Sequence, residues 1–350
     1  MRGLIVAAGE GKRMRPITYW RPKPLVPIAD VPLMVHILRG FVAAGVSEIC
    51  VVVGHLRQQM IDTLGDGSAW GASIHYEVQE EAHGTGAAVL LARDYLADPS
   101  TGSGSGDEPF MLSWGDILVP PSHYRRVVDA YGPDVDGVLS ANPVDDPWEG
   151  AAVYVDGGLV SRVVEKPDRG TSTTKFNNAG IFILPGEVLD LTAALPPSTR
   201  GEVELPQAID QLLTAGRRLR AVEVEGYWSD VARVGTAIAI NAKVIRALGG
   251  HLWVSATADI HPSATILAPI YVEAGATIGA GATVGPNVSL HRGATIGAGA
   301  KVSNAILLAG ASVGENCRID WCYAEDEAAV PGGTVLPGRA DAPFVLPPPR

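Results

Sequence analysis

Cysteine, aromatic residues and long apolar runs are all scarce in this 350-residue sequence. The three cysteines form no Cys-x-x-Cys pair and are odd in number, which argues against a disulfide framework or a structural zinc site and favours a reducing compartment. No apolar run reaches the roughly 18 residues that a transmembrane helix needs, and the apolar start at residues 4–8 is too short for a secretory signal. The sequence therefore predicts a cytoplasmic protein that does not bind membranes.

An excess of positive charge is absent as well. The formal net charge is −11 at pH 7, so no basic face is left for nucleic acid once a cluster of cations near the N-terminus is assigned to a ligand. Hydrophobic residues, in contrast, make up 47% of the chain, which also contains 41 glycines and 26 prolines. This composition predicts a turn-rich chain with a full core and room for two domains.

The first 32 residues carry the most unusual features. Residues 3–7 form an apolar run typical of a buried first strand, which Gly9, Glu10 and Gly11 then break into a loop. Glycines at this point let main-chain N–H groups approach an anion closely. The loop also carries five cations, Lys12, Arg13, Arg15, Arg21 and Lys23. Its prolines predict an extended rather than helical backbone: Pro16, Pro22, Pro24 and Pro27. Together these features suit a bound polyphosphate.

A glycine-rich turn after a first strand is common in α/β proteins, and this one fits neither of two well-known phosphate-binding patterns. No Gly-Lys-Ser/Thr follows, as a Walker A loop requires, and Lys-Arg-Met replaces the third glycine of a dinucleotide fingerprint. The complete spaced string instead resembles the signature of the sugar-1-phosphate nucleotidyltransferases, or NDP-sugar pyrophosphorylases: Gly9-x-Gly11-x-Arg13-Met14-x-Pro16, Pro22-Lys23-Pro24-Leu25-x-Pro27 and Pro32.

Downstream of this stretch, apolar residues alternate between helical and strand spacing. The pattern predicts helices over 33–44, 56–64 and 87–96 and strands over 48–53, 74–78 and 110–113. Such an order favours a mostly parallel sheet between helices, with ligands at the carboxyl ends of the strands. Amphipathic helices over 204–215 and 236–248 would close this domain, residues 1–249, which the resemblance implies is a Rossmann-like nucleotidyltransferase domain.

The resemblance implies roles for individual residues at the nucleotide. Ala8, Gly9 and Gly11 would hold the triphosphate, while Arg13 and Lys23 would be the catalytic cations that stabilise charge on the pyrophosphate and α-phosphoryl groups. A second nucleotide-binding segment is Gln79-Glu80-Glu81-Ala82-His83-Gly84-Thr85-Gly86, which follows the strand over 74–78.

The base preference would depend on this second segment. The spacing from Gln79 to Gly84 equals that of uridylyl and thymidylyl members, and an amide can pair with the N3–H and a carbonyl of uracil or thymine. Thr85 opens the helix that follows. If Glu80 or Glu81 turned inward, guanine would be accepted, and adenylyl members with a glutamine also exist. Alternatively, Gln79 only ends a strand.

Two aspartates are candidates for Mg²⁺. Asp116 follows the strand over 110–113, where an isolated aspartate is commonly a turn residue, but the resemblance implies a metal-binding aspartate at this place. Asp230, in a Trp-x-Asp stretch, matches the family's second metal position. Because Mg²⁺ uses one or two carboxylates together with substrate phosphate oxygens, this pair would suffice.

The sugar phosphate would contact a third group of residues. The resemblance implies that the main chain of Gly150 approaches the sugar, that Glu165 accepts sugar hydroxyls and that Lys166 meets the phosphate. Asn178 falls where related enzymes contact the C2 substituent. The alternatives are a solvated ion pair at 165–166 and a simple turn at 177–178.

An aliphatic residue then recurs every six positions, with one five-residue step: Ile260, Ile266, Val272, Ile278, Val284, Leu290, Ile296, Val302, Leu307, Val313 and Ile319. Glycine and alanine fill most places between. The pattern resembles a left-handed parallel β-helix over residues 250–326, followed by an acidic, proline-rich tail over 327–350. With three hexads per coil, these eleven positions predict a short helix of between three and four coils, with a structural or oligomerising role.

These observations lead to one function and several alternatives. We expect an α/β enzyme that transfers a nucleotidyl group from UTP or dTTP to a sugar 1-phosphate such as glucose 1-phosphate, with Mg²⁺, as a homo-oligomer. The alternatives are a guanylyl- or adenylyltransferase acting on a hexose or cyclitol phosphate, a non-catalytic regulatory subunit, and a bifunctional acetyltransferase. The last would use His261 or His291 as a base and is disfavoured by the predicted shortness of the β-helix.

Overall fold

The computed structural model describes residues 1–81, 83–97, 108–198 and 201–349. The chain divides into two compact units. Residues 1–10 and 34–228 form the sheet unit, and residues 11–33 and 229–350 form the β-helix unit. By contact, therefore, the loop over 11–33 and the helix over 234–247 group with the β-helix rather than with the sheet.

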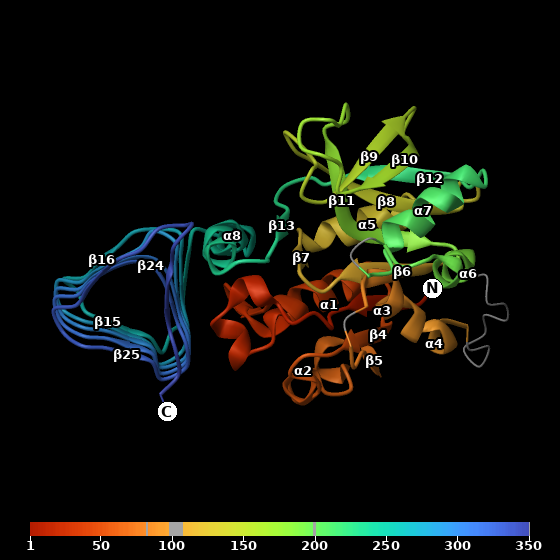
Figure 1. Ribbon diagram of the computed structural model, residues 1–350. Helices are drawn as coiled ribbons and strands as arrows, with labels where there is room; N and C mark the ends of the chain where they lie inside the picture. The colour runs from red at the N-terminus through yellow and green to blue at the C-terminus, as the bar shows by residue number, and fades with distance from the viewer. Residues whose placement is uncertain (82, 98–107, 199–200, 350) are drawn as a thin grey trace. The chain divides into compact units, whose positions relative to one another are not determined.

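A mixed nine-stranded sheet forms the centre of the sheet unit (Figure 1). Its strand order is β5-β4-β1-β6-β11-β8-β12-β10-β9. The first four neighbours run parallel: β5 (Ser73–Val78), β4 (Glu48–Val53), β1 (Gly3–Val6) and β6 (Phe110–Trp114). The others are β11 (Phe176–Leu184), β8 (Gly137–Pro143), β12 (Leu219–Glu223), β10 (Leu159–Glu165) and β9 (Ala151–Asp156). β11 is antiparallel to both of its neighbours, β6 and β8.

Helices cover both faces of this sheet, and β1 packs against both layers because its successive side chains point to opposite sides. Leu4 belongs to a core shared with α3 (Thr85–Leu91), α6 (Glu187–Ala194) and α7 (Leu205–Thr214). On the other face Phe41 of α1 (Leu33–Ala43) lies against Gly3, where a Cβ would be 2.8 Å from its ring. Phe41 also contacts Tyr124 of α5 (Pro121–Asp129), with 5.4 Å between ring centroids.

The predicted alternation of strands and helices is confirmed, with one element divided. The helix expected over 87–96 is two helices, α3 and α4 (Arg93–Ala97). The helix expected over 56–64 is α2 (Arg57–Leu64). In the described ranges of the chain no helix is both long and apolar enough to cross a lipid bilayer.

The signature loop, residues 11–33, differs from the extended backbone that its prolines predicted. It folds into three short 3₁₀ turns, η1 (Lys12–Met14), η2 (Ile17–Tyr19) and η3 (Lys23–Leu25), and a small hairpin of β2 (Pro27–Ile28) and β3 (Val31–Pro32). Proline fits the first residues of such a turn, where no N–H is needed, so it shapes these turns rather than preventing them. The extended prediction was wrong for this reason.

In the β-helix unit, short parallel strands stack in regular register. The strands are β14 (Leu252–Val254), β15 (Asp259–Ile260), β16 (Thr265–Ile266), β17 (Ile270–Val272), β18 (Thr277–Ile278), β19 (Thr283–Val284), β20 (Val288–Leu290), β21 (Thr295–Ile296), β22 (Lys301–Leu307), β23 (Ser312–Val313), β24 (Arg318–Ala324), β25 (Ala329–Val330), β26 (Val335–Pro337) and β27 (Phe344–Leu346). Ile260 pairs with Ile278 and Ile278 with Ile296, an 18-residue coil, whereas Ile296 pairs with Val313 across the five-residue step. Nine of the eleven aliphatic positions belong to one buried core, and the other two, Ile260 and Ile266, are partly buried and pack against it, which confirms the β-helix with three hexads per coil.

The stack is longer than the hexad positions predicted. One face holds five strands in the order β15-β18-β21-β23-β25, and pairing continues through β27, which ends at Leu346. The expectation of three to four coils was therefore wrong, because the six-residue spacing continues beyond the positions counted. It extends to Val254 at one end and to Val330 and Leu336 at the other, which pair with Val272, Val313 and Ile319. The strands β26 and β27 both pair with β24, within the range that the sequence suggested as a tail.

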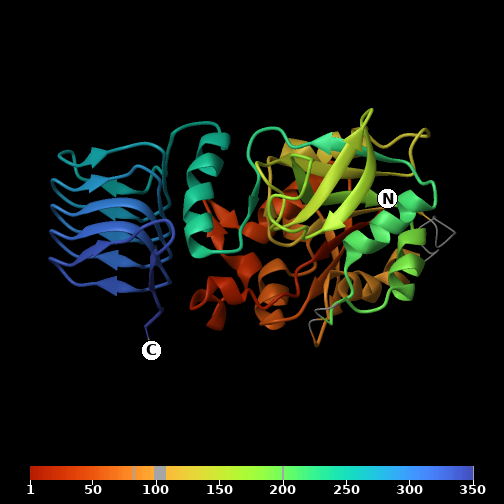
Figure 2. The same cartoon turned by 45° about the horizontal axis from the view of Figure 1, so that its top comes forward.

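Helix α8 (Val234–Ala247) runs along the stack and contacts strands of successive coils (Figure 2). Asparagines join the two elements. Asn241 of α8 donates to Asn287 at 3.2 Å, and Asn287 donates to the main-chain oxygen of Ile238 at 2.8 Å. Ser289 donates to the side-chain oxygen of Asn241 at 3.0 Å. Because these groups are buried and bonded to one another, they fix α8 on the coils.

Candidate active site

Three of the predicted segments meet at one edge of the sheet unit. β1, β4, β5 and β6 run parallel, with Val6 level with Val52 and Trp114, and Val53 level with Val78. The segments that follow these strands therefore leave the sheet together, and they contain Ala8 and Gly9, Gln79, and Asp116. Ligands of open α/β sheets bind at this edge.

Glycines bring the main chains close together at this edge. A Cβ on Gly54, directly after β4, would lie 2.5 Å from the main-chain oxygen of Ala8. A Cβ on Gly115, directly after β6, would lie 2.7 Å from the Cβ of Ala7. The sequence analysis missed both residues, although a glycine immediately after an apolar strand was their visible signal.

Gly9 has a different environment. Within the described ranges, no heavy atom outside its chain neighbours lies within 4 Å of the place where its Cβ would be, and its φ lies outside the left-handed region. Neither packing nor backbone conformation therefore requires glycine there. A bare main chain that faces open space is suited to contact with a ligand group such as a phosphate.

The candidate catalytic residues of the β-helix unit lie in and beside the signature loop. Gly11 has φ +63°, and a Cβ there would be 2.9 Å from Thr18 and 3.1 Å from the Cβ of Lys23. Thr18 donates to the main-chain oxygen of Gly11 at 3.1 Å. Arg13 Nη2 lies 3.8 Å from the Oδ2 of Asp230, and both side chains are substantially exposed. The loop thus packs Lys23 against Gly11 and brings Arg13 near Asp230.

Arg15 and Arg21 contact residues that do not belong to the predicted site. Arg15 stacks over the ring of Tyr19, 5.2 Å from its centroid. Arg21 forms ion pairs with Glu325 and Asp326, each at 2.7 Å. Arg21 was grouped with the phosphate-binding cations on charge alone, and its partners, more than 300 residues away in the sequence, gave no local signal.

The segment proposed for the base begins at the end of β5 and leads into α3. Glu80 pairs with Arg57 at 2.7 Å and Glu81 with His83 at 3.0 Å, and the two carboxylate side chains are 72% and 79% exposed. Both acidic groups therefore already have side-chain partners at the protein surface. Ala82 lies outside the described residues.

The start of α3 is fixed by residues 203–205. Gly84 has φ +98°, and a Cβ there would lie 2.5 Å from the main-chain oxygen of Val203. The hydroxyl of Thr85 accepts a hydrogen bond from the main-chain N–H of Leu205 at 3.2 Å. Only glycine fits the position of Gly84 without strain, so the main chain there keeps one conformation.

Three of the four predicted sugar-side residues lie together. The main-chain N–H of Lys166 donates to the oxygen of Gly150 at 2.9 Å, and Lys166 Nζ lies 3.7 Å from Glu165. Lys166 is 48% exposed and has φ +41°, in the left-handed region that residues other than glycine rarely adopt. A Cβ on Gly150 would be 3.5 Å from the amide nitrogen of Asn177, a residue that the sequence analysis did not select.

Asn178 lies in a strand with an irregularity, not in an isolated turn. The register of β11 against β8 shifts between Asn178 and Phe182, and Asn178 accepts a hydrogen bond from the N–H of Gly180 at 2.8 Å. Gly180 has φ +81°, and a Cβ there would lie 2.5 Å from Trp114. The bulge carries the strand past Trp114, while Trp228 donates to the oxygen of Ala179 at 3.1 Å.

The predicted metal ligands are aspartates, the oxygen donors that Mg²⁺ prefers. Asp116 is half-buried at the carboxyl end of β6, and the side chain of Asp230 is 37% exposed. Among the residues that the structure describes, no group of three or more His, Cys, Asp or Glu side chains could hold a metal ion. This donor set suits a cation that completes its shell with substrate and water, as Mg²⁺ does with phosphates.

The two histidines considered as acyltransferase bases have local partners. His261 Nδ1 lies 2.8 Å from the hydroxyl of Ser263. His291 is 8% exposed, and its Nδ1 lies 3.5 Å from Glu273. The hydrogen bond with His291 holds the pKa of Glu273 below its ordinary value. Because the β-helix has more coils than expected, its length no longer argues against an acyltransferase. The burial of His291 does, because a buried ring is not accessible to a substrate as a general base.

The parallel part of the sheet thus brings glycine-bearing segments, an amide and a carboxylate to the edge at which open α/β sheets bind ligands. The chain belongs to the nucleotidyl transferase family, whose profile matches residues 2–246. Residues 266–331 match a second profile, described as the GMPPB C-terminal domain.

Individual relatives agree with this family. The chain is 31% identical over 246 residues to the glucose-1-phosphate thymidylyltransferase of Streptomyces griseus, covering 70% of this chain and 66% of that relative. It is 30% identical over 283 residues to the mannose-1-phosphate guanyltransferase of Candida albicans, covering 75% and 73% of the two chains. A crystal structure from Bacillus anthracis described as a glucose-1-phosphate thymidylyltransferase superimposes with a TM-score of 0.61 at 25% identity, over 69% of this chain and 94% of that one.

Proposed function

We propose that the protein transfers a nucleotidyl group from a nucleoside triphosphate to a sugar 1-phosphate and releases pyrophosphate. The observation that carries the proposal is the meeting of Gly9, Gln79 and Asp116 at one edge of the parallel sheet, in a chain of the nucleotidyl transferase family. The relatives named above include transferases for two different bases, thymine and guanine.

In this reaction an oxygen of the sugar phosphate attacks the α-phosphorus of the triphosphate. The new bond joins that oxygen to the α-phosphorus, the bond from the α-phosphorus to the β-bridging oxygen breaks, and pyrophosphate leaves with the electron pair. The protein needs no nucleophile of its own, because its work is to position the reactants and neutralise charge. We assign Ala8, Gly9 and Gly11 to the triphosphate and Arg13 and Lys23 to the charge that develops on it.

Mg²⁺ would supply positive charge to the phosphate oxygens when bound, and Asp116 and Asp230 are the residues that would hold it. The oxygen donors of these aspartates fit the ion, as described above. The proximity of Arg13 and Asp230, 3.8 Å apart, supports a role for both residues at the same anionic substrate.

The sugar 1-phosphate would bind beside β9 and β10. Lys166 would orient the attacking phosphate, Glu165 would accept sugar hydroxyls, and the main chain of Gly150 would approach the ring. Their mutual contacts at 2.9 and 3.7 Å support this grouping. Asn178 is proposed for the C2 substituent, although its side-chain oxygen also caps Gly180.

For the base we propose uracil or thymine. Gln79 offers one donor and one acceptor to the N3–H and carbonyl edge. Two carboxylates that would favour guanine are held elsewhere, since Glu80 pairs with Arg57 and Glu81 with His83. A guanyltransferase among the relatives keeps guanine as the alternative.

Gln79→Glu should shift preference toward GTP by at least about tenfold in the ratio of kcat/KM values, because a carboxylate pairs with the N1–H and N2–H₂ edge of guanine and repels a uracil carbonyl. The comparison is kcat/KM for UTP, dTTP and GTP in the wild type and the variant. Gln211→Glu, an exposed position on α7, makes the same chemical change away from the site and should leave the ratio unaltered. Wild-type turnover of GTP or ATP at ten times the UTP and dTTP rates would overturn the base assignment and leave the reaction class intact.

A coupled pyrophosphate-release assay tests the reaction class. The wild type is assayed with five nucleoside triphosphates against a set of hexose, amino-sugar and cyclitol 1-phosphates. We expect release only when both substrates are present, with UTP or dTTP giving the highest kcat/KM. If no pair of substrates releases pyrophosphate, the proposed enzymatic activity is wrong, and a non-catalytic regulatory subunit is favoured.

We further propose that the chain self-associates through its β-helix in the cytoplasm. All three cysteines are buried and free, which is compatible with a reducing compartment. β14 is the edge strand of its sheet, and its apolar side chains are exposed: Leu252, Trp253 and Val254. Such an edge is a template for pairing. Sedimentation at micromolar concentration should show an oligomer, and a single sharp monomer boundary would contradict this.

A further inference from the structure

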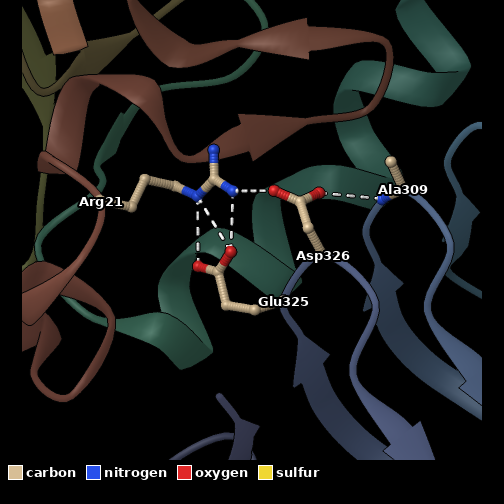
Figure 3. A network of polar contacts seen from close by, with 4 residues as sticks. All are labelled: Arg21, Ala309, Glu325 and Asp326. Carbon is tan, nitrogen blue, oxygen red and sulfur yellow. Dashed lines mark hydrogen bonds and ion pairs between the residues drawn. The ribbon is translucent and has the colours of Figure 1, made fainter. Parts of the chain in front are cut away.

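The signature loop is held by charged groups of the β-helix that no part of the proposed chemistry uses. Arg21 lies two residues before Lys23, and its guanidinium faces the segment directly after β24 (Figure 3). Nε donates to both oxygens of Glu325, at 3.1 and 3.2 Å, and Nη2 donates to Glu325 at 2.7 Å. Nη2 also donates to Asp326 at 2.7 Å.

This contact is unlike an ordinary surface ion pair. Glu325 is 1% exposed and the Arg21 side chain 20% exposed, so the pair is shielded from water and salt. Burial alone would lower the pKa of Arg21, but the hydrogen bond with Glu325 and the nearby negative charges outweigh it and raise the pKa above its ordinary value. A fork of bonds to a buried carboxylate fixes the direction of the guanidinium as well as its distance.

Both acidic residues are themselves held by the coils, Glu325 through its main chain and Asp326 through its carboxylate. The main-chain N–H of Glu325 donates to Leu346 of β27 at 3.0 Å. Asp326 accepts the main-chain N–H of Ala309 from the preceding coil at 3.1 Å, as Figure 3 shows. Arg21 is therefore attached to a framework whose backbone is bonded on both sides.

A second attachment lies beyond Lys23. Ala29 has φ +56°, and its main-chain N–H donates to the side-chain oxygen of Asn241 on α8 at 2.8 Å. Asn241 is bonded in turn to Asn287 and Ser289 of the coils. The segment with Lys23 is thus held on one side at Arg21 and on the other at Ala29, both times by the β-helix unit.

We propose that Glu325 and Asp326 are positioning residues for nucleotidyl transfer, which act through Arg21 to hold the signature loop in the shape that presents Lys23 and Arg13. This inference rests on the proposed function and adds a catalytic purpose to the β-helix. We call the attachment of Arg21 to Glu325 and Asp326 the clamp. Since a displacement of about 1 Å in a charge-stabilising group can cost about 100-fold in rate, loosening the clamp should lower kcat more than it raises KM.

The test uses the full-length protein with Glu325→Gln, Asp326→Asn and, as a matched control, Asp341→Asn. Asp341 also pairs with an arginine of this unit, Arg339 at 2.9 Å, but both are exposed and remote in sequence from the loop. Hydrogen exchange of residues 11–33 is one readout, and kcat and KM for pyrophosphate release are the other. Hydrogen exchange can be measured without enzymatic turnover, so it separates failure of the clamp from failure of the proposed reaction.

We expect Glu325→Gln to speed exchange in residues 11–33 by about tenfold or more, with strands β1, β4 and β6 unchanged, and to lower kcat by about tenfold. Asp326→Asn should change both in the same direction by a smaller factor, and Asp341→Asn should change neither. Unchanged loop exchange and unchanged kcat in Glu325→Gln would overturn the proposal. Should Glu325→Gln fail to fold, Asp326→Asn decides in the same way, because its side chain is 51% exposed and its loss leaves the core intact.

Discussion

Asp116→Ala is expected to lower turnover by about 100-fold or more at every Mg²⁺ concentration while the protein stays folded. The carboxylate follows Gly115 at the end of β6 and is not part of the hydrophobic core, so its removal costs little packing. Loss of a metal ligand typically costs at least about 10–100-fold in affinity or activity. The measurement is kcat for pyrophosphate release across a Mg²⁺ titration, beside a thermal unfolding curve.

The control for this experiment is Asp129→Ala, which removes an exposed carboxylate of α5 that pairs with Arg125 at 3.1 Å. It should retain near wild-type turnover. Retention of more than about a tenth of wild-type activity by Asp116→Ala at every Mg²⁺ concentration, including the lowest, would exclude the metal role. A recovery of Asp116→Ala at high Mg²⁺ would indicate that Asp116 contributes to metal affinity alone.

Lys23→Ala should depress kcat/KM by about 100-fold, a typical cost of losing one charge-stabilising donor at a reacting phosphoryl group. Lys23→Arg should restore little of it. The stem of Lys23 packs beside Gly11, since a Cβ on Gly11 would lie 3.1 Å from the Cβ of Lys23. The planar guanidinium of an arginine at this position cannot take the place of the compact ammonium of Lys23.

Lys243→Ala is the matched control for this pair of variants, because it removes an exposed ammonium from α8 in the same unit. Its kinetics should equal those of the wild type. Full activity in Lys23→Arg would show that any cation suffices at this position, and full activity in Lys23→Ala would remove the residue from the catalytic set.

Local patterns were sufficient to predict most of the architecture. The alternation of apolar periods gave the elements of the sheet unit within a few residues, since buried strands and amphipathic helices each carry their period in the sequence. The hexads predicted the β-helix because each coil repeats the same stacking requirement, and Ile278 does pair with Ile296.

Errors arose where the outcome depended on contacts distant in sequence. The charge of Arg21 suggested phosphate binding, because nothing near it in sequence discloses Glu325. The last coils were not recognised because a second five-residue step, from Ile319 to Ala324, interrupts the spacing before Val330 and Leu336 resume it. One further error was local: prolines in the signature loop predicted an extended chain, but proline fits the first residues of a 3₁₀ turn, and the loop folds into such turns.

The candidate site residues also fall into two groups, those that local sequence patterns reveal and those that depend on close approach or distant partners. The glycine after β1, Gln79 and Asp116 could be found because each follows an apolar strand, and parallel strands bring such positions to one edge. Gly54, Asn177 and the clamp on Arg21 matter through close approach or through a distant partner, which single-sequence patterns do not encode.

The most direct test of nucleotidyl transfer is phosphorus NMR of the wild-type protein with Mg²⁺, dTTP or UTP, and glucose 1-phosphate. We predict that the sugar phosphate resonance decays as two products grow in equal amounts, pyrophosphate and the diphosphate of a nucleotide sugar. Growth of inorganic phosphate or nucleoside monophosphate while the sugar phosphate resonance stays constant would mean hydrolysis, and would contradict the proposed transfer.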